Sequence, residues 1–470
     1  MLWSAMQKFG VMGISFVSNV ILARLLTPEE FGCMGMLAIF ILLCNTFVDG
    51  GFGSALIQKK QPTHRDYSTI FWWNIGLSVI LYGLLFLFAP VVARFYNMSL
   101  LCDVLRVQGL VLIFNALRLI QTNQLRKRLQ FRLLAITNIV AAVVSVLVAI
   151  VMAFMGFGVW SLVAQQLVLA AVNALLVCAV GKWKPSFVFS FASFRELFNF
   201  GFFILLSNLV NTFCNNVQGL LIGRMYNPAT MGFYSQARKL EEVVSNSLSQ
   251  VVDQVAYPVL AEAQHDKTYM QVILKKLITS LAFVVFPLML VMALAARPLI
   301  VLVYSAKWLP AVPYFQILCV AGMASCLQGI NYYAVAAVGK SGSLFNWTLV
   351  KRGFGLLFLL GGLYCWGVEG LLCGMVMAST FIYLVNAWLV QKHVGYRVLT
   401  QLRDLVPVTL LSVAAFGIGY LARLPFADNM WLGGCVAAMV YALVYLGAAW
   451  LMRMDAMQEA RNLLFKKRKK

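Results

Sequence analysis

The sequence predicts an all-α polytopic membrane protein with about fourteen transmembrane helices. Of its 470 residues, 62% are hydrophobic and 11% are charged, and the mean hydropathy is +0.84. Soluble domains carry about 25% charged residues, so this composition indicates an integral membrane protein. Apolar runs of about 20 residues, the length that crosses a bilayer, recur along the chain, and basic residues gather in alternate loops between them.

The predicted spans follow these apolar runs in order. They lie at residues 3–23, 33–57, 68–88, 102–124, 133–155, 159–180, 198–222, 232–260, 277–302, 313–338, 346–364, 368–390, 404–422 and 431–452. The first run is interrupted by Lys8, and no small-residue cleavage site follows before Arg24. We therefore interpret it as a span rather than a signal peptide.

The basic residues predict the orientation. With the N-terminus inside, 26 of the 37 Lys and Arg residues fall in cytoplasmic loops or the tail, and six fall in the opposite loops. Because Lys and Arg accumulate on the cytoplasmic side, both termini are predicted to be cytoplasmic, with a basic connector at 181–196 and a basic tail at 453–470. The net charge of +21 is thus explained by topology, and nucleic acid is not an expected partner.

The chain also repeats itself. The pattern Leu22-Ala23-Arg24-x3-Pro28-x3-Gly32 returns 200 residues later as Ile222-Gly223-Arg224-x3-Pro228-x3-Gly232, and Gly158-Val159-x2-Leu162 returns as Gly367-Val368-x2-Leu371. Six spans per copy give both copies the same orientation, so the repeats are parallel. We predict an N-terminal six-helix lobe at 1–180, a C-terminal six-helix lobe at 197–395, and two appended helices at 396–452.

Polar stripes mark the first and seventh spans. Since lipid offers no hydrogen-bond partner, these faces are expected to line a water-filled cavity between the two lobes. The alternative is that they are polar contacts between packed helices. The candidate polar lining residues are Ser15, Asn19, Asn208, Asn211, Asn215 and Gln218.

Charged residues inside the spans supply the candidate binding groups. Lys8 and Arg118 have no partner nearby in sequence, which favours contact with a mobile anion, whereas Arg238 is spaced to pair with Glu241 or Glu242 on one helix face. The candidate anion contacts are Lys8, Arg118, Arg238 and Lys239. Asp49 and Asp253 are candidates for coupling to a cation or proton, although a pair between Asp49 and Lys8 is slightly preferred.

The sequence disfavours an enzyme, a metal site and a cofactor. Gly339-Lys340-Ser341 resembles the end of a phosphate-binding loop, but Ala334 stands where that motif needs its first glycine. Neither Gly-x-Ser-x-Gly nor His-Glu-x-x-His occurs. The ten cysteines form no Cys-x-x-Cys and lie mostly within apolar spans, where cysteine behaves as a small hydrophobe.

Several motifs resemble those of a known family. Residues 23–32 (ARLLTPEEFG) and 49–58 (DGGFGSALIQ), with 232–237 (GFYSQA) and 257–260 (YPVL), are similar to the Wzx-type lipopolysaccharide and exopolysaccharide flippases of the multidrug/oligosaccharidyl-lipid/polysaccharide superfamily. The resemblance implies a V-shaped, alternating-access carrier in a bacterial inner membrane. It would move a polyprenyl-pyrophosphate-linked oligosaccharide outward through the phospholipid bilayer, alongside polysaccharide polymerase and export machinery.

Two other functions remain open at this point. A cation-coupled drug or metabolite antiporter of the same superfamily would have a cavity lined with acids, and the excess of Lys and Arg argues against it. A non-transporting assembly factor would tolerate neutralisation of the polar stripe.

Overall fold

A computed structural model describes residues 2–454, except Lys182 and Ala427, together with Met457 and Gln458. The side chains at 2, 4, 5, 54, 199, 200, 250–255, 341 and 345 also fall outside the described part, as does most of the predicted basic tail. Over the described residues the chain is helical and contains no strand, which confirms the predicted all-α class.

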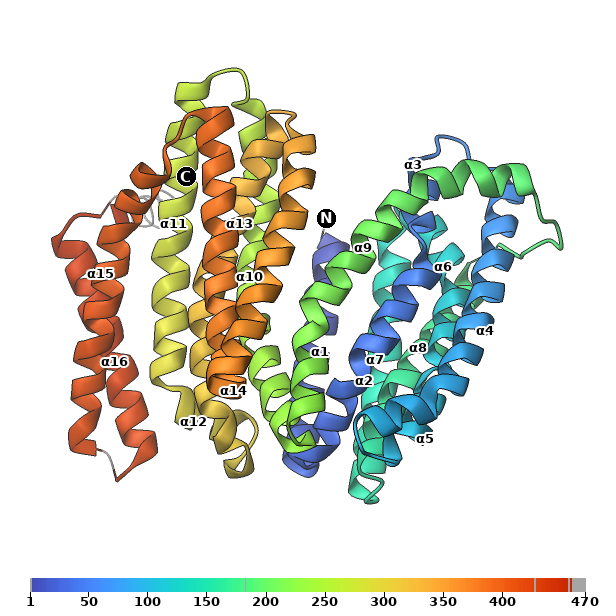
Figure 1. Ribbon diagram of the computed structural model, residues 1–470, viewed down its shortest axis with the longest axis horizontal. Coiled ribbons are helices and arrows are strands. Elements are labelled where there is room, and N and C mark those ends of the chain that lie inside the picture. The colour runs from blue at the N-terminus through green and yellow to red at the C-terminus, as the bar shows by residue number, and fades with distance from the viewer. Residues whose placement is uncertain (1, 182, 427, 455–456, 459–470) are drawn as a thin grey trace. The chain divides into compact units, whose positions relative to one another are not determined.

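The helices follow one another with short connections (Figure 1). They are α1 (Leu2–Leu25), α2 (Pro28–Asp49), α3 (Phe52–Gln58), α4 (His64–Phe95), α5 (Leu100–Gln108), α6 (Val111–Lys127), α7 (Phe131–Phe154), α8 (Val159–Val180), α9 (Phe191–Met225), α10 (Pro228–Glu262), α11 (Lys267–Leu294), α12 (Ala296–Val303), η1 (Ala306–Ala311), α13 (Val312–Ala337), α14 (Ser341–Val394), α15 (Val398–Arg423), η2 (Leu424–Phe426) and α16 (Met430–Leu451).

Eleven helical stretches among the described residues are long and apolar enough to cross a membrane, and α9, bent by 50° near Gly201, would make twelve. The chain is therefore a multi-pass membrane protein. The predicted count of fourteen is not confirmed. The label α14 covers two helices that meet at the non-helical residues Trp366 and Gly367, where the spans predicted at 346–364 and 368–390 were separated, and we call this pair the α14 hairpin. Helix α10 is not among the twelve.

The chain divides into two compact units, one formed by residues up to Ser235 and the other from Gln236 onward. Helix α9, which we expected to open the second lobe, packs against α2 and α3 within the first unit and begins at Phe191, inside the predicted connector. The predicted lobe boundaries at 1–180, 197–395 and 396–452, and a cavity between the lobes, stay predictions.

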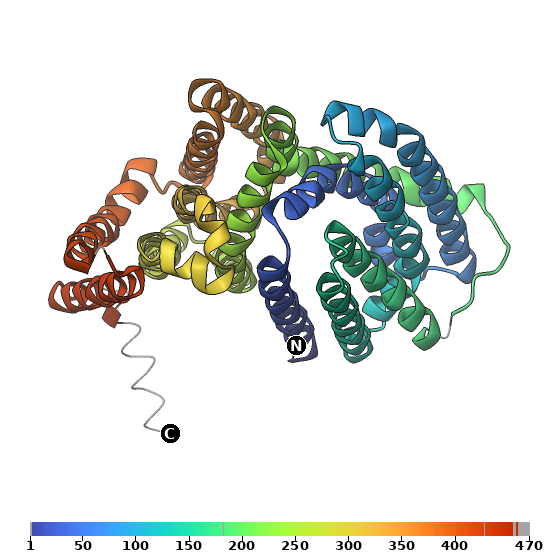
Figure 2. The same cartoon turned by 90° about the horizontal axis from the view of Figure 1, so that it is seen from below.

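Each unit has its own helix packing (Figures 1 and 2). In the first unit α7 packs between α1 and α8, and α4 packs on α5 and α6. In the second unit α13 packs on α11 and α14, while α15 and α16 form a hairpin against α11. That hairpin is anchored by an apolar cluster in which the Tyr445 hydroxyl donates a hydrogen bond of 3.0 Å to the Phe283 carbonyl.

The two copies of the repeated motif meet within the first unit. A Cβ added to Gly32 would lie 1.8 Å from the Pro228 carbonyl oxygen, and a Cβ added to Gly232 would lie 2.0 Å from the Pro28 carbonyl oxygen. The starts of α2 and α10 therefore cross in reciprocal backbone contact, which only glycine permits at these two positions.

Local geometry also repeats at the later motif. Gly158 before α8 has φ 54° and ψ −127°, and Gly367 within α14 has φ 65° and ψ −139°. Both glycines occupy a left-handed region that other residues adopt rarely. The sequence echo at the two hairpins thus corresponds to nearly identical backbone turns.

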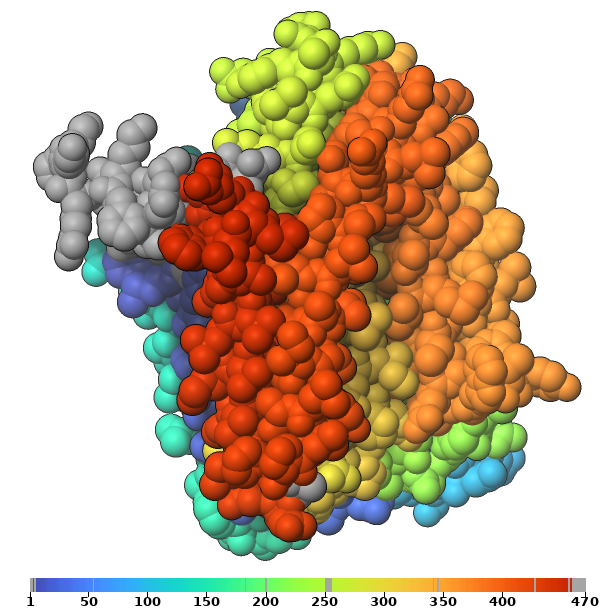
Figure 3. Space-filling view, turned by 90° about the vertical axis from the view of Figure 1, so that its left-hand side faces the viewer, coloured from blue at the N-terminus to red at the C-terminus, as the bar shows by residue number. Residues whose placement is uncertain are grey.

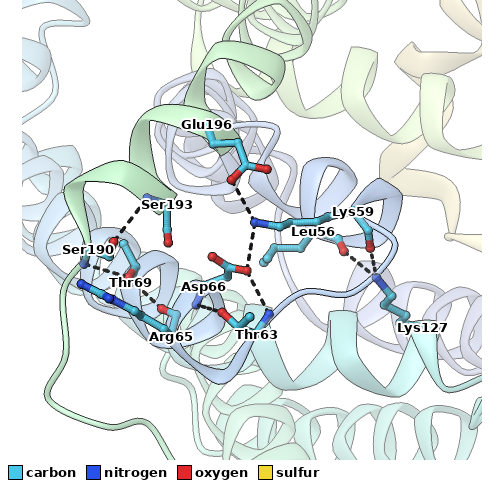
Figure 4. A network of polar contacts seen from close by, with 10 residues as sticks. All are labelled: Leu56, Lys59, Thr63, Arg65, Asp66, Thr69, Lys127, Ser190, Ser193 and Glu196. Carbon is cyan, nitrogen blue, oxygen red and sulfur yellow. Dashed lines mark hydrogen bonds and ion pairs between the residues drawn. The ribbon is translucent and has the colours of Figure 1, made fainter.

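A polar network joins α3, α4, α6 and α9 at the end that carries the basic loops (Figure 4). Lys59 forms ion pairs with Asp66 at 3.1 Å and with Glu196 at 3.0 Å, and Asp66 also caps α4 through the Thr63 backbone N–H at 2.9 Å. Lys127 donates to the carbonyl oxygens of Leu56 and Lys59. Partial burial of Lys59 opposes its charged form, but hydrogen bonds to Glu196 and Asp66 outweigh it and raise the pKa of Lys59.

The reciprocal glycine contact predicts that Gly32→Ala destabilises the protein, because the new methyl group would overlap the Pro228 carbonyl and force α2 and α10 apart. Overpacking of this kind costs about 1–3 kcal/mol, so the melting temperature of the detergent-purified protein should fall by several degrees. Gly83→Ala in α4 is the matched control, since nothing lies within 4 Å of its added Cβ. Equal melting temperatures for the two variants would contradict the contact.

The polar network predicts unequal effects from its two acids. Asp66 has a side chain that is 3% exposed and caps α4, so Asp66→Ala should cost about 1–2 kcal/mol of stability. Glu196 is 62% exposed, and Glu196→Ala should cost less than about 1 kcal/mol, as surface ion pairs do. Thermal unfolding of both variants at one salt concentration measures the difference, and a larger loss for Glu196→Ala would refute this assignment.

Candidate functional site

The first unit contains an arginine held at membrane depth by a chain of amides. On α6, the Arg118 Nε donates to the Asn115 Oδ1 at 3.1 Å, and the Asn115 Nδ2 donates to the Asn45 Oδ1 on α2 at 2.8 Å. Asn45 in turn donates to the Ile41 carbonyl at 3.0 Å. Asn45 lies in the apolar helix α2, and Asn115 and Arg118 lie in the more apolar first part of α6, before the polar stretch that begins at Gln121. Where lipid offers no hydrogen-bond partner, such side chains rely on other protein groups.

This geometry leaves the charge of Arg118 uncompensated. Among the described residues, no carboxylate oxygen lies within 4 Å of its guanidinium, and the side chain is only half-buried. The hydrogen bond at Nε orients the guanidinium while its two terminal nitrogens receive no hydrogen-bond acceptor from that part of the chain. Terminal guanidinium nitrogens form the fork that binds phosphate or carboxylate in two parallel hydrogen bonds.

The polar groups continue from α2 to α9. Thr46, next to Asn45, lies 3.3 Å from Thr212 between their hydroxyl oxygens, which links α2 to the predicted amide face of the seventh span. On that face Asn208 and Asn215 are exposed and Asn211 is half-buried. Gln218 differs, because it is buried and donates to the Asn215 carbonyl at 2.7 Å. Asn208, Asn211 and Asn215 therefore stay candidates for substrate contact, whereas Gln218 contributes to packing.

The polar stripe of α1 divides in the same way. Ser18 is fully buried and accepts a hydrogen bond of 2.8 Å from Gln165 on α8, and Asn19 is also buried. These two residues fit the alternative of polar contacts between packed helices. Lys8 and Ser15, by contrast, are exposed.

The ion pair that we expected between Lys8 and Asp49 is wrong. Both residues are described, and they form no ion pair. The physical reason is the packing of their helices, since α1 packs against α7 whereas α2 packs against α9. Asp49 is exposed at the C-terminal end of α2, before the left-handed residues Gly50 and Gly51.

The charged residues of α10 lie in the second unit. The Arg238 Nε donates to the Glu242 Oε1 at 2.7 Å, the pairing that the four-residue spacing predicted. Glu241 is buried against Gly322 of α13, and Lys239 is exposed. Arg238 is therefore neutralised by its own helix, which makes it a weaker anion contact than Arg118. The side chain of Asp253 lies outside the described residues.

Sequence analysis missed Lys351, which we counted among the cytoplasmic loop charges. Lys351 lies inside α14 with an exposed fraction of 5%, and its Nζ donates to the Asn386 Oδ1 at 2.8 Å. No described carboxylate lies within 4 Å of this ammonium. Asn386 also donates to the Gln328 carbonyl on α13 at 3.3 Å.

The first unit has a comparable polar pair in its own hairpin. Asn173 on α8 donates to Asn138 on α7 at 2.5 Å. The 209-residue offset between Gly158 and Gly367 maps these two residues onto Trp347 and Ile382, one helical turn before Lys351 and Asn386, so the repeat does not predict the buried lysine. The signal that could have identified Lys351 is its position inside the predicted span at 346–364.

Comparisons with known proteins agree with this architecture. Residues 21–313, more than half of the chain, match the family described as "Polysaccharide biosynthesis protein". The chain is 27% identical to the teichuronic acid biosynthesis protein TuaB of Bacillus subtilis over 455 residues, which are 94% of this chain and 93% of TuaB. It is 25% identical to the lipopolysaccharide biosynthesis protein WzxC of Escherichia coli, over 68% of this chain and 66% of WzxC.

A solved structure shares the fold. The lipid II flippase MurJ in an inward closed conformation superposes with a TM-score of 0.77 at 14% identity, covering 96% of this chain and 99% of MurJ. This likeness extends through the helices of both units. The chain belongs to the polysaccharide biosynthesis protein family, the family of the Wzx-type transporters that its motifs resemble.

Proposed function

We propose that this protein is an alternating-access flippase that moves a polyprenyl-pyrophosphate-linked oligosaccharide across the bacterial inner membrane for surface polysaccharide synthesis. Both termini are cytoplasmic in this proposal, because the basic loops lie on the side of the termini. The partners are the lipid-linked oligosaccharide, the phospholipid bilayer and, further along the pathway, a polysaccharide polymerase and its export machinery. The role is transport rather than catalysis.

The observation that carries the proposal is Arg118, oriented through its Nε by Asn115 and lacking a described carboxylate within 4 Å. An arginine within a membrane span carries an insertion cost that reaches about 2.5–3.5 kcal/mol at the centre of the span. A structural role would be served better by a neutral side chain or by an ion pair. An anionic substrate that binds the terminal guanidinium nitrogens would explain why an arginine is present here in spite of its insertion cost.

The amides of α9 suit the rest of the substrate. Asn208, Asn211 and Asn215 follow one another at spacings of three and four residues, on one helix face, and none of them is buried. Amides both donate and accept hydrogen bonds, so they bind sugar hydroxyls without requiring one particular glycan. Arg118 would hold the pyrophosphate and the α9 amides the first sugars, with Lys8 and Ser15 as further exposed polar contacts of the first unit.

The chemistry favours this proposal over a cation-coupled antiporter. Such a protein needs an acid that is held in a site where a cation can replace its proton. Asp49, one of the two candidate coupling residues, is instead exposed at the end of a helix. An assembly factor that does not transport would have no use for an unpaired arginine within a span. Both alternatives predict that neutralising Arg118 leaves polysaccharide export intact.

The first functional prediction concerns Arg118. In a strain whose surface polysaccharide depends on this protein, Arg118→Gln should lower export by about tenfold or more, the effect of losing charge-assisted hydrogen bonds. Arg118→Lys should retain part of the export because the charge remains while the fork is lost. Arg403→Gln, an exposed arginine on α15, is the control. Export at the control level by Arg118→Gln, at normal protein amounts, would refute the proposed function.

The second functional prediction concerns Lys351. Lys351→Met removes the desolvation cost of a buried charge but leaves the Asn386 Oδ1 without its donor, and because these two effects oppose each other the melting temperature should change by no more than a few degrees. If the charge serves transport, export should nevertheless fall several-fold. Lys340→Met, at the exposed start of the same hairpin, is the matched control. A lower melting temperature, with export reduced only in proportion to protein amount, would assign Lys351 a purely structural role.

A further inference from the structure

The second unit contains a pocket that the proposed function does not use. It has a volume of about 520 Å³ and lies where α12, α13, α15 and η2 come together, at the end of the unit opposite the basic loops. Two arginines line it, Arg297 at the start of α12 and Arg423 at the end of α15. The outward-facing loops hold few basic residues, so two of them in one pocket is a local concentration of positive charge.

Neither arginine is neutralised by the part of the chain that the structure describes. No carboxylate there lies within 4 Å of Arg297 or Arg423, and Asp428 in the nearby loop forms no ion pair with either. An anion bound in the pocket would be attracted by both guanidinium groups. The pocket therefore has the charge of an anion site without an internal anion.

The pocket is built from fixed elements. The Gln316 amide nitrogen donates to the Ala293 carbonyl at 2.9 Å, which ties the start of α13 to the end of α11. The Arg423 stem packs at Gly433, where an added Cβ would lie 3.3 Å from the Arg423 Cγ. The Arg423 side chain thus starts on α15 and its stem lies against α16.

The rim of the pocket is apolar and exposed. Tyr420 is 51% exposed, Leu424 is 55% exposed and Leu309 is 36% exposed. They continue into the apolar outer surface of α15 and α16, drawn in red in Figure 3. Arginines beside a tyrosine and leucines at a helix end match the membrane interface, where lipid phosphates meet acyl chains.

We infer that this pocket binds the phosphate group of a lipid, with Arg297 and Arg423 on the phosphate oxygens and the lipid chain along Tyr420 and Leu424. A soluble anion would use the two guanidinium groups but would gain nothing from the apolar rim. This binding does not depend on transport. The pocket would face the outer leaflet of the membrane, and this one point rests on the orientation given in the proposed function. Two sources share this chemistry, an anionic phospholipid and a polyprenyl phosphate.

The experiment measures lipid binding to the detergent-purified full-length protein by native mass spectrometry. Dioleoylphosphatidylglycerol and undecaprenyl phosphate are titrated separately, with dioleoylglycerol as the lipid that lacks phosphate. Arg297→Gln/Arg423→Gln should weaken binding of the phosphate lipids by about tenfold or more, since charge-assisted hydrogen bonds are lost. Arg94→Gln, an exposed arginine outside the pocket, should bind like the unchanged protein.

Comparing the affinities of the two phosphate lipids shows which kind of lipid the pocket prefers. Tighter binding of undecaprenyl phosphate supports a polyprenyl ligand, and tighter binding of phosphatidylglycerol supports a phospholipid. Arg297→Lys/Arg423→Lys guards against misfolding, because it keeps both charges and should retain most of the binding at an unchanged melting temperature. Unaltered affinity of the glutamine variant for both phosphate lipids, or equal binding of dioleoylglycerol, would overturn the inference.

Discussion

Lipid supplies no hydrogen bonds, and this constraint decides how the polar side chains of this protein are used. Many of the described ones donate to a backbone carbonyl of their own helix, as Asn45 does to Ile41. Others are met by a polar side chain on a neighbouring helix, as Ser18 is by Gln165 and Asn138 by Asn173. Arg118 and Lys351 are also met by amide oxygens, from Asn115 and Asn386. An amide oxygen orients a cation but does not neutralise it. Hydrogen bonding to an amide therefore stabilises these side chains between helices but leaves the positive charges of Arg118 and Lys351 without a neutralising partner among the described residues.

The internal repeat explains where these groups lie. The glycines of its first motif allow α2 and α10 to cross in backbone contact, and those of its second set the same turn at two hairpins. Within that shared scaffold the copies differ in side chains. The hairpin of the first unit holds an amide pair, Asn138 with Asn173, whereas the hairpin of the second unit holds Lys351 with Asn386 one helical turn from the equivalent positions, and the first unit has Arg118 on α6. The two copies of the repeat thus share their glycine contacts and turns, and the two units differ in the charged side chains that these helices carry.

Sequence reasoning succeeded where the signal is local. Apolar runs revealed the membrane class, and the four-residue spacing of Arg238 and Glu242 predicted their ion pair. It failed where the answer depends on which helices are neighbours. The expected pair of Lys8 and Asp49 does not form because α1 and α2 pack on different partners, and Asn45 meets Asn115 across 70 residues. Lys351 was counted with the neighbouring loop charges although it lies inside the predicted span at 346–364, because the rule that basic residues mark cytoplasmic loops does not separate a charge near a helix end from one inside it.

The four candidate cations are not equivalent for binding a phosphate. A phosphate that approached Arg238 would meet Glu242, which already lies 2.7 Å from its Nε, so repulsion would offset much of the attraction. The exchange would also give up a helical ion pair worth about 0.3–0.5 kcal/mol. Lys8 and Lys239 are exposed, and an ammonium in that setting is a flexible point charge without the planar fork. Arg118 has neither handicap, because Asn115 fixes its plane from the Nε side and no described acid competes for its terminal nitrogens. If phosphate recognition resides in the first unit, its free energy should therefore be concentrated on this one side chain rather than shared among the basic residues.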